Sequence, residues 1–153
     1  MTKFTYTHWD VLLASPDEPL AQKKRDRQLG RMKQGLKNLE QSPRPSLDDW
    51  EVVADAVNMM ETLLEMGAVE DKDDAIGDAV AALAKAGTRA ITTDVLRLDG
   101  PAISLLRGVL EDYEMVLENL PARTMIVAHR ATEKRVQAII AGTCKPEHVK
   151  VPA

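Results

Sequence analysis

Pairs of carboxylates one helical turn apart are the residues of this chain best suited to chemistry. Glu111 and Glu114 are three residues apart, and Glu61 and Glu65 are four apart, so each pair would share one face of a helix. Paired acids of this kind can hold Mg²⁺ against the phosphates of a nucleotide, as in all-α nucleotide pyrophosphohydrolases. Glu111, Glu114 and Glu118, however, are predicted to lie opposite the apolar face of their helix, where carboxylates are usually solvated. The pattern therefore favours a solvated acidic face, and a Mg²⁺-dependent nucleotide hydrolase is the residual enzyme hypothesis.

The histidines and the cysteine have spacings typical of metal ligands, but there are too few of them. His129 and Glu133 are four residues apart, whereas a ferritin-like di-iron centre needs Glu-x-x-His motifs on two helices. A partly buried structural histidine is the favoured interpretation of His129. Cys144 and His148 have a zinc-compatible spacing, but a structural zinc site needs four ligands. The sequence also lacks a nucleophile elbow, a phosphate-binding loop and a dinucleotide fingerprint. We therefore expect no catalytic residue, no metal site and no cofactor.

Composition predicts a cytoplasmic protein that does not enter a membrane. The single cysteine leaves no intramolecular disulfide, and no apolar run approaches the ~18 residues of a membrane span. With 3% aromatic residues and seven methionines, the core must be filled by aliphatic side chains, which suits helices packing on helices. We expect one helical domain over residues 1–153, with 1–18 packed against its body and 143–153 as a flexible tail.

Apolar residues spaced three and four apart predict five helices, over residues 19–39, 47–66, 71–86, 101–120 and 121–141. Ser46 caps the second, which is apolar over more than half its circumference and should therefore be central or part of an interface. Gly87 is expected to end the third helix. The short link before the last helix predicts antiparallel neighbours. The fold class is therefore all-α, a compact bundle of about five helices with a C-terminal antiparallel helical hairpin.

Charge is sorted along the chain, whose formal net charge is −4. Residues 20–45 contain eight basic and two acidic side chains, whereas residues 46–78 contain eleven acidic and one basic. Neighbouring helices could simply neutralise each other, at ~0–1 kcal/mol for each surface pair, and this is the favoured interpretation of the first helix. Alternatively, the basic faces bind phosphate or an acidic partner. The candidate residues for such binding are Lys23, Lys24, Arg27, Arg31, Arg123, Arg130 and Lys134.

Methionine-rich apolar surface on the first two predicted helices indicates protein binding. Methionine side chains repack easily against varied partners, although for each one taken alone a place in the core is favoured. We expect a non-enzymatic interaction module, forming a homodimer, that binds or inhibits a partner protein complex. The candidate self-association residues are Met32, Leu36, Trp50, Met59, Met60 and Leu63.

Two other functions remain open. A nucleic-acid-binding regulator could use the basic helix faces, but it is not favoured, because an acidic chain is repelled by phosphate and few aromatics are present to stack on bases. A small acidic helical protein can also occupy a nucleic-acid channel as a decoy, as anti-CRISPR proteins of mobile elements can. Only the charge and the size of the chain support such a counter-defence inhibitor.

Overall fold

The computed structural model describes residues 4–140, which form α-helices, one short 3₁₀ turn and no β-strand. The predicted all-α bundle is therefore confirmed. The predicted tail 143–153, with Cys144 and His148, lies outside the described residues. The helices are α1 (His8–Leu13), α2 (Gln22–Gln41), α3 (Leu47–Glu65), α4 (Ala75–Thr93), α5 (Gly100–Asn119) and α6 (Ala122–Ile140). Within residues 4–140, none of these helices combines the length and the apolar character needed to cross a bilayer.

Three helices begin at residues whose side chains cap them. The Ser46 hydroxyl accepts from the backbone N–H of Asp49, whose carboxylate accepts from the N–H of Ser46, and this capping box starts α3. Thr7 and Asp10 form the same arrangement at the start of α1. Asp99 caps α5 by accepting from a backbone N–H of its first turn. Each such cap typically stabilises a helix by ~1 kcal/mol.

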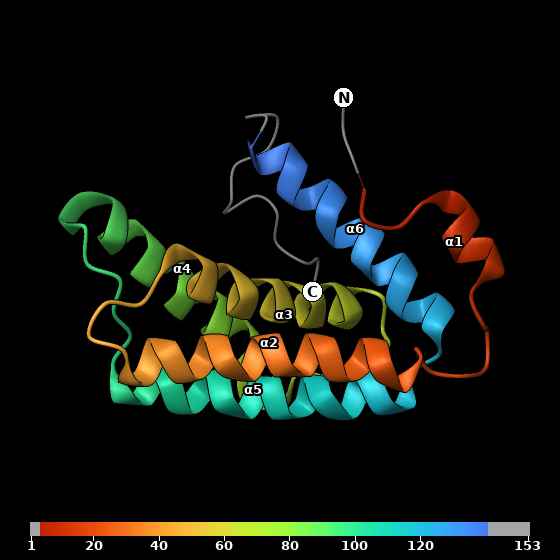
Figure 1. Cartoon of the computed structure of the whole chain (residues 1–153), viewed down its shortest axis with the longest axis horizontal. Coiled ribbons are helices and arrows are strands. Elements are labelled where there is room, and N and C mark those ends of the chain that lie inside the picture. Colours follow the sequence, from red (N-terminus) through yellow and green to blue (C-terminus); the bar gives the residue numbers. More distant parts are fainter. Residues whose placement is uncertain (1–3, 141–153) are drawn as a thin grey trace.

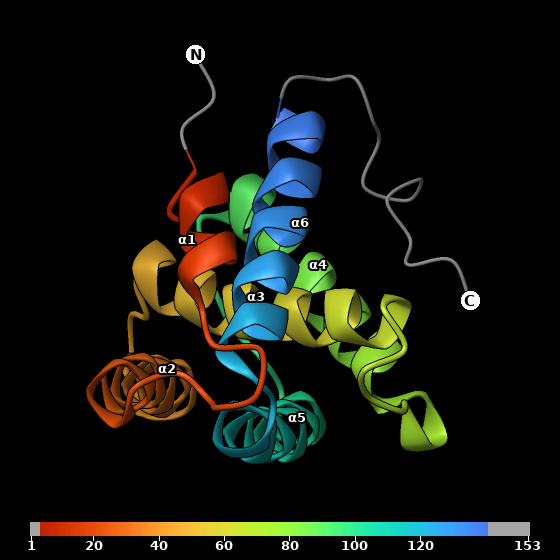
Figure 2. The same cartoon turned by 90° about the vertical axis from the view of Figure 1, so that its right-hand side faces the viewer.

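The central element is α3, as its wide apolar surface predicts. Helices α2, α4, α5 and α6 all pack against it. Figure 1 shows α2 and α5 side by side and running in opposite directions, and Figure 2 shows the same two helices end-on. Val53, Val57 and Leu63 of α3 are completely buried. The core of the bundle is therefore organised around one helix rather than around a symmetric set.

The last helix differs in its packing from the expected hairpin. The link after α5 is short, but α6 packs on α3 and α1 instead of running back along α5, and Figure 2 shows it rising away from α5. The sides of α5 are already covered by α2, α3 and α4. At the start of α6, the backbone N–H groups of Ala122 and Arg123 donate to the carbonyl oxygens of Glu18 at 2.7 Å and Ser15 at 3.0 Å. The N-terminal segment therefore sets the direction of α6.

The third predicted helix is longer than expected. The prediction that it ends at Gly87 is wrong, because α4 continues to Thr93. A Cβ atom on Gly87 would lie only 3.0 Å from Cζ2 of Trp50. The indole Nε1 of Trp50 donates to the carbonyl oxygen of Leu83 at 3.0 Å. The glycine therefore makes room for a tryptophan of α3 against α4 and does not terminate the helix.

Candidate interaction surface and adjoining cleft

The residues predicted to mediate self-association lie within one chain. Trp50 is half-buried against α4, and the other five are at most 7% exposed. The five buried side chains stabilise the fold of a single copy and are not accessible to a second one, and Trp50 packs against α4 of the same chain. The predicted self-association surface is therefore wrong, because its residues pack within one chain: Met32, Leu36, Trp50, Met59, Met60 and Leu63.

The basic residues predicted on α2 form an exposed row. Lys23, Lys24, Arg27 and Arg31 follow one another at helical spacings along the first half of α2, and all four are exposed. Lys23 and Lys24 lie in the first turn of α2, where the helix dipole disfavours positive charge. We call these four residues the basic stripe.

Two of the three basic residues predicted on α6 have a different role, because they hold the N-terminal segment. The Arg123 guanidinium donates to two carbonyl oxygens of α1, at 3.1 and 3.2 Å. Arg130 donates to the carbonyl oxygen of Tyr6 at 2.6 Å, and its guanidinium carbon lies 4.8 Å from the centre of the Phe4 ring. Both side chains are engaged within the chain, whereas Lys134 is exposed.

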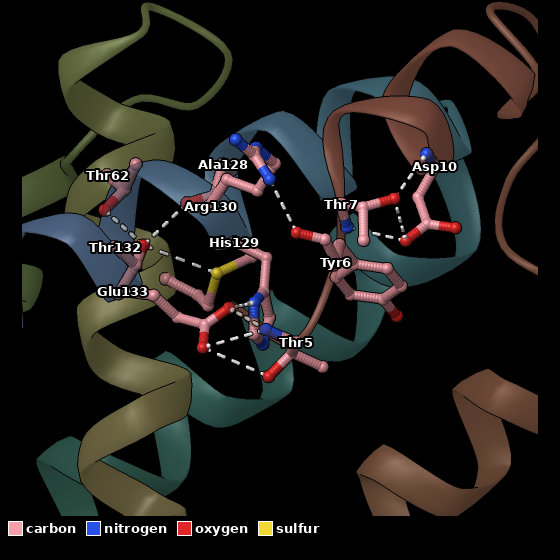
Figure 3. A network of polar contacts seen from close by, with 11 residues as sticks. Thr5, Tyr6, Thr7, Asp10, Thr62, Ala128, His129, Arg130, Thr132 and Glu133 are labelled. Carbon is pink, nitrogen blue, oxygen red and sulfur yellow. Dashed lines mark hydrogen bonds and ion pairs between the residues drawn. The ribbon is translucent and has the colours of Figure 1, made fainter. Parts of the chain in front are cut away.

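A carboxylate on α6 holds the same segment from another side. Glu133 accepts from the backbone N–H of Thr5 at 3.0 and 3.2 Å, and from its hydroxyl at 3.1 Å. His129 Nδ1 lies 2.9 Å from the same carboxylate, and the Tyr6 ring stands edge-on to the imidazole with the centroids 5.2 Å apart. Figure 3 shows this cluster together with the Arg130 contact on the other side of the segment. His129 is thus a partly buried histidine that packs and pairs within the chain.

The short helix that this segment leads into adds no buried residue to the core. Val11 packs partly against the core, while Trp9, Leu12 and Leu13 share the opposite face through their spacing of three and four. These three side chains are 71%, 53% and 82% exposed. A helix fixed mainly through its backbone therefore presents three large apolar groups to solvent. We call Trp9, Leu12 and Leu13 the α1 face.

The basic stripe begins beside the segment that carries the α1 face. Lys24 Nζ lies 5.7 Å from the centre of the Tyr6 ring. Hydrogen bonds from the backbone N–H and the hydroxyl of Thr7 hold the pKa of Asp10 below its usual value, and the charge of Lys24 adds to this effect. One end of the basic stripe therefore lies near the segment that leads into α1.

A cleft of about 500 Å³ is bounded by the N-terminal segment and by α2, α3, α5 and α6. Apolar side chains of α2 and α3, among them Met32 and Met59, form part of its lining. Charged groups also line it, including Arg31, Asp55 and the Glu133 carboxylate. Burial, followed by the negative charge of Glu51, raises the pKa of Asp55. The sequence did not single out Asp55, because it is one of many acids in the run 46–78.

Metal-binding groupings are not seen in residues 4–140, where no three His, Cys, Asp or Glu side chains are placed to share an ion. Glu111 and Glu118 are exposed on α5. The carboxylate of Glu114 pairs with Lys33 Nζ of α2 at 3.1 Å. The α5 acids considered for Mg²⁺ therefore stand on the outer side of that helix, in contact with solvent or with a lysine. Glu61 and Glu65 of α3 pair instead with Arg135 of α6, at 3.4 and 3.6 Å.

Comparison of the chain with protein-family models, with curated proteins and with solved structures yields no match.

Proposed function

We propose that this chain is a non-enzymatic, cytoplasmic interaction module that binds an acidic partner protein through the α1 face and the basic stripe. The observation that carries this proposal is the exposure of Trp9, Leu12 and Leu13 on a helix that adds no buried residue to the core. Large apolar side chains gathered at the surface mark interaction sites, and tryptophan is enriched among the residues that dominate binding energy. Core stability does not account for a helix held in this way.

Charge favours an acidic partner over a second copy at this surface. Lys24, at one end of the basic stripe, lies beside the segment that leads into α1, and an apolar centre with a polar rim is the usual arrangement of a protein interface. In a two-fold dimer the same patch meets itself, so the stripe of one copy would approach that of the other. Like charges facing each other across an interface are costly, whereas an acidic partner is attracted. A homodimer through the α1 face is therefore the alternative occupant.

Nucleic acid is the second candidate, because the basic stripe is accessible. Phosphate recognition would use Lys23 and Arg27, but it would leave the leucines of the α1 face without a role. The net charge of −4 also opposes the approach of a polyanion. The counter-defence hypothesis would instead need an acidic face that enters a nucleic-acid channel, and the α1 face with the basic stripe does not supply one.

The test compares Leu13→Asp on α1 with Met115→Asp on α5. Met115 is 63% exposed and lies outside both named surfaces, so it is a matched control for adding an acid at an exposed apolar position. We expect a partner captured from the native cells, and then purified, to bind Leu13→Asp at least about tenfold more weakly, while Met115→Asp binds as the unmodified chain does. Circular dichroism of both variants verifies the fold.

Three results would overturn the proposal. Equal binding by the two variants would remove the α1 face from the interface. A dimer mass in light scattering that Leu13→Asp converts to a monomer would identify a second copy as the occupant. The chain could also be retained on heparin in a salt-sensitive way. If Lys23→Glu abolished this retention and Leu13→Asp left it unchanged, nucleic acid would be identified as the partner.

A further inference from the structure

Residues 4–18 lie along one side of α6 and run in the opposite direction to that helix. The contacts begin at Glu133, whose carboxylate accepts from Thr5. They end at the first turn of α6, where backbone N–H groups donate to the carbonyl oxygens of Ser15 and Glu18. Figure 3 shows the part of this contact around Glu133. We call residues 4–18 the strap.

Most hydrogen bonds between α6 and the strap use the main chain of the strap. The guanidinium group of Arg130 donates to the carbonyl oxygen of Tyr6. That of Arg123 donates to the carbonyl oxygens of Val11 and Leu12, in the last turn of α1. Main-chain groups are common to all polypeptides, and hydrogen bonds to them give affinity with little demand on sequence. A segment of another protein could therefore satisfy the same donors and acceptors of α6.

Charge favours an acidic segment on this side of α6. The strap contains three acidic residues and neither lysine nor arginine. Arg123, Arg130 and Lys134 follow one another at intervals of seven and four, so they share one face of α6. These three cations outnumber the Glu133 carboxylate, which binds an N–H and a hydroxyl of the strap. Complementary charge steers association and disfavours wrong partners, so an acidic peptide is the class of ligand that this face fits.

The strap adds little to the core of the bundle. Its helix, α1, adds no buried residue and packs on α6. Tyr6, Val11 and Ala14 are partly buried against the core. Segments with few buried apolar contacts open locally at a lower free energy than global unfolding requires. The strap can therefore leave α6 while the rest of the bundle stays folded.

We propose that the strap is an autoinhibitory segment, and that the face of α6 beneath it binds an acidic peptide segment of another protein. When the strap leaves, Arg123 and Arg130 lose their bonds to its carbonyl oxygens and become free for such a ligand, beside the exposed Lys134. The proposed function makes no use of these three residues. The inference goes beyond that function and does not rest on it, although displacement of the strap would also move the α1 face, which lies on its outer side.

The test uses the full chain and a fluorescent synthetic peptide with the sequence of residues 4–18 as the probe. The chain's own strap competes with this probe, so the apparent affinity is reduced to the fraction of molecules whose strap is open. Thr5→Pro removes the N–H and the hydroxyl that bond Glu133 and leaves α6 unchanged. In fluorescence anisotropy this variant should bind the probe at least about tenfold more tightly than the unmodified chain. His8→Ala, at an exposed position of the strap, is the matched control and should bind as the unmodified chain does.

Changes in the probe test recognition separately, because they leave the chain's own strap intact. A probe whose three acids are replaced by the corresponding amides should bind at least about tenfold more weakly. A probe that carries Thr5→Pro should lose affinity by about the factor that the same change in the chain gains. In NMR spectra of the ¹⁵N-labelled chain, saturation with the unmodified probe should shift the amide signals of the strap and of α6, while those of α5 stay in place.

Tyr6→Ala is a second variant that loosens the strap, because it removes the ring that packs edge-on against His129, and it should show the same gain. Urea unfolding verifies that the bundle of each variant stays folded. Equal affinity of the unmodified chain and both loosened variants for the probe, or no binding by either loosened variant, would overturn the autoinhibition. Equal binding of the charged and amide probes, or tighter binding of a single-stranded DNA of similar length, would overturn an acidic peptide as the ligand.

Discussion

Alanine at Gly30 should stabilise the protein, whereas alanine at Gly35 should not, although both glycines lie in α2. A Cβ atom on Gly35 would lie 3.0 Å from the Asp49 carbonyl oxygen and 3.5 Å from a methyl carbon of Val53, both on α3. A Cβ atom on Gly30 would meet nothing within 4 Å. The two positions therefore share the benefit of a better helix former, but only Gly35 lies at a close approach of two helices.

The magnitudes follow from these two effects. Alanine is favoured over glycine in a helix by ~1 kcal/mol, which should appear in full at Gly30. At Gly35 the same gain is opposed by overpacking against a backbone oxygen that cannot rotate away, at ~1–3 kcal/mol. Gly30→Ala should therefore raise the free energy of unfolding by about 1 kcal/mol. Gly35→Ala should change it by between about zero and a loss of 2 kcal/mol.

Urea unfolding followed by far-UV circular dichroism measures both changes, provided that the m-values of the variants agree. The difference between the two variants, about 1–3 kcal/mol, isolates the cost of the close contact. Equal stabilisation by both alanines would refute the close approach of α2 and α3 at Gly35. A loss of stability at Gly30 would refute the exposure of that side of α2.

Two further predictions concern the attachment of α1. Arg123→Ala removes both hydrogen bonds to α1 carbonyl oxygens, so the backbone amides of α1 should exchange with deuterium about tenfold faster. Lys134→Ala, on the same helix, should leave the exchange rates of these amides unchanged. Equal exchange rates in the two variants would contradict the anchoring role of Arg123. The pKa of Asp10 is lower in the folded chain than in the unfolded chain. Its carboxylate therefore stabilises α1 fully above the unfolded-state pKa of about 3.9, and this stabilisation is lost as the pH falls through the folded-state pKa. Protection of the α1 amides against hydrogen exchange should therefore decline at acidic pH, and in Asp10→Asn this pH dependence should disappear. A decline of the same size in Asp10→Asn would contradict the role of the Asp10 carboxylate.

The extents of α2, α3, α5 and α6 could be predicted from local signals, whereas α1 was not among the five predicted helices. The cap at Ser46 and the proline in the first turn of α5 identify where α3 and α5 begin, because these signals act within one turn. Gly87 shows where such signals fail. A glycine near the expected end of a helix usually indicates that the helix stops there. Gly87 instead leaves space for the ring of Trp50, which lies 37 residues away in the sequence.

The direction of α6 and the role of its arginines depend on contacts that the sequence pattern does not encode. Arg130 bonds a carbonyl oxygen 124 positions earlier in the chain, so its alternation with apolar residues predicted only an outward-facing charge.

The sorting of charge is explained in part by pairing within the bundle, as the neutralisation hypothesis predicts. Lys33 of α2 pairs with Glu114 of α5, and the side chains of Glu40 and Arg107 join the same two helices. Arg135 of α6 lies 3.4 Å from the carboxylate of Glu61 on α3. Within residues 4–140, the basic stripe takes no part in these ion pairs, and neither do Arg25, Lys37 and Arg44 of the same basic run.

Photo-crosslinking from the α1 face in the native cells tests the proposed function most directly. A benzophenone amino acid replaces Leu12 in one version of the chain and Met115 in another, both of them exposed positions. We expect Leu12 to crosslink a discrete acidic protein and Met115 to give none. Equal yields of crosslinks from both positions to the same proteins would contradict an acidic partner at this surface. So would crosslinks from Leu12 that reach nucleic acid or a second copy of the chain and no other protein.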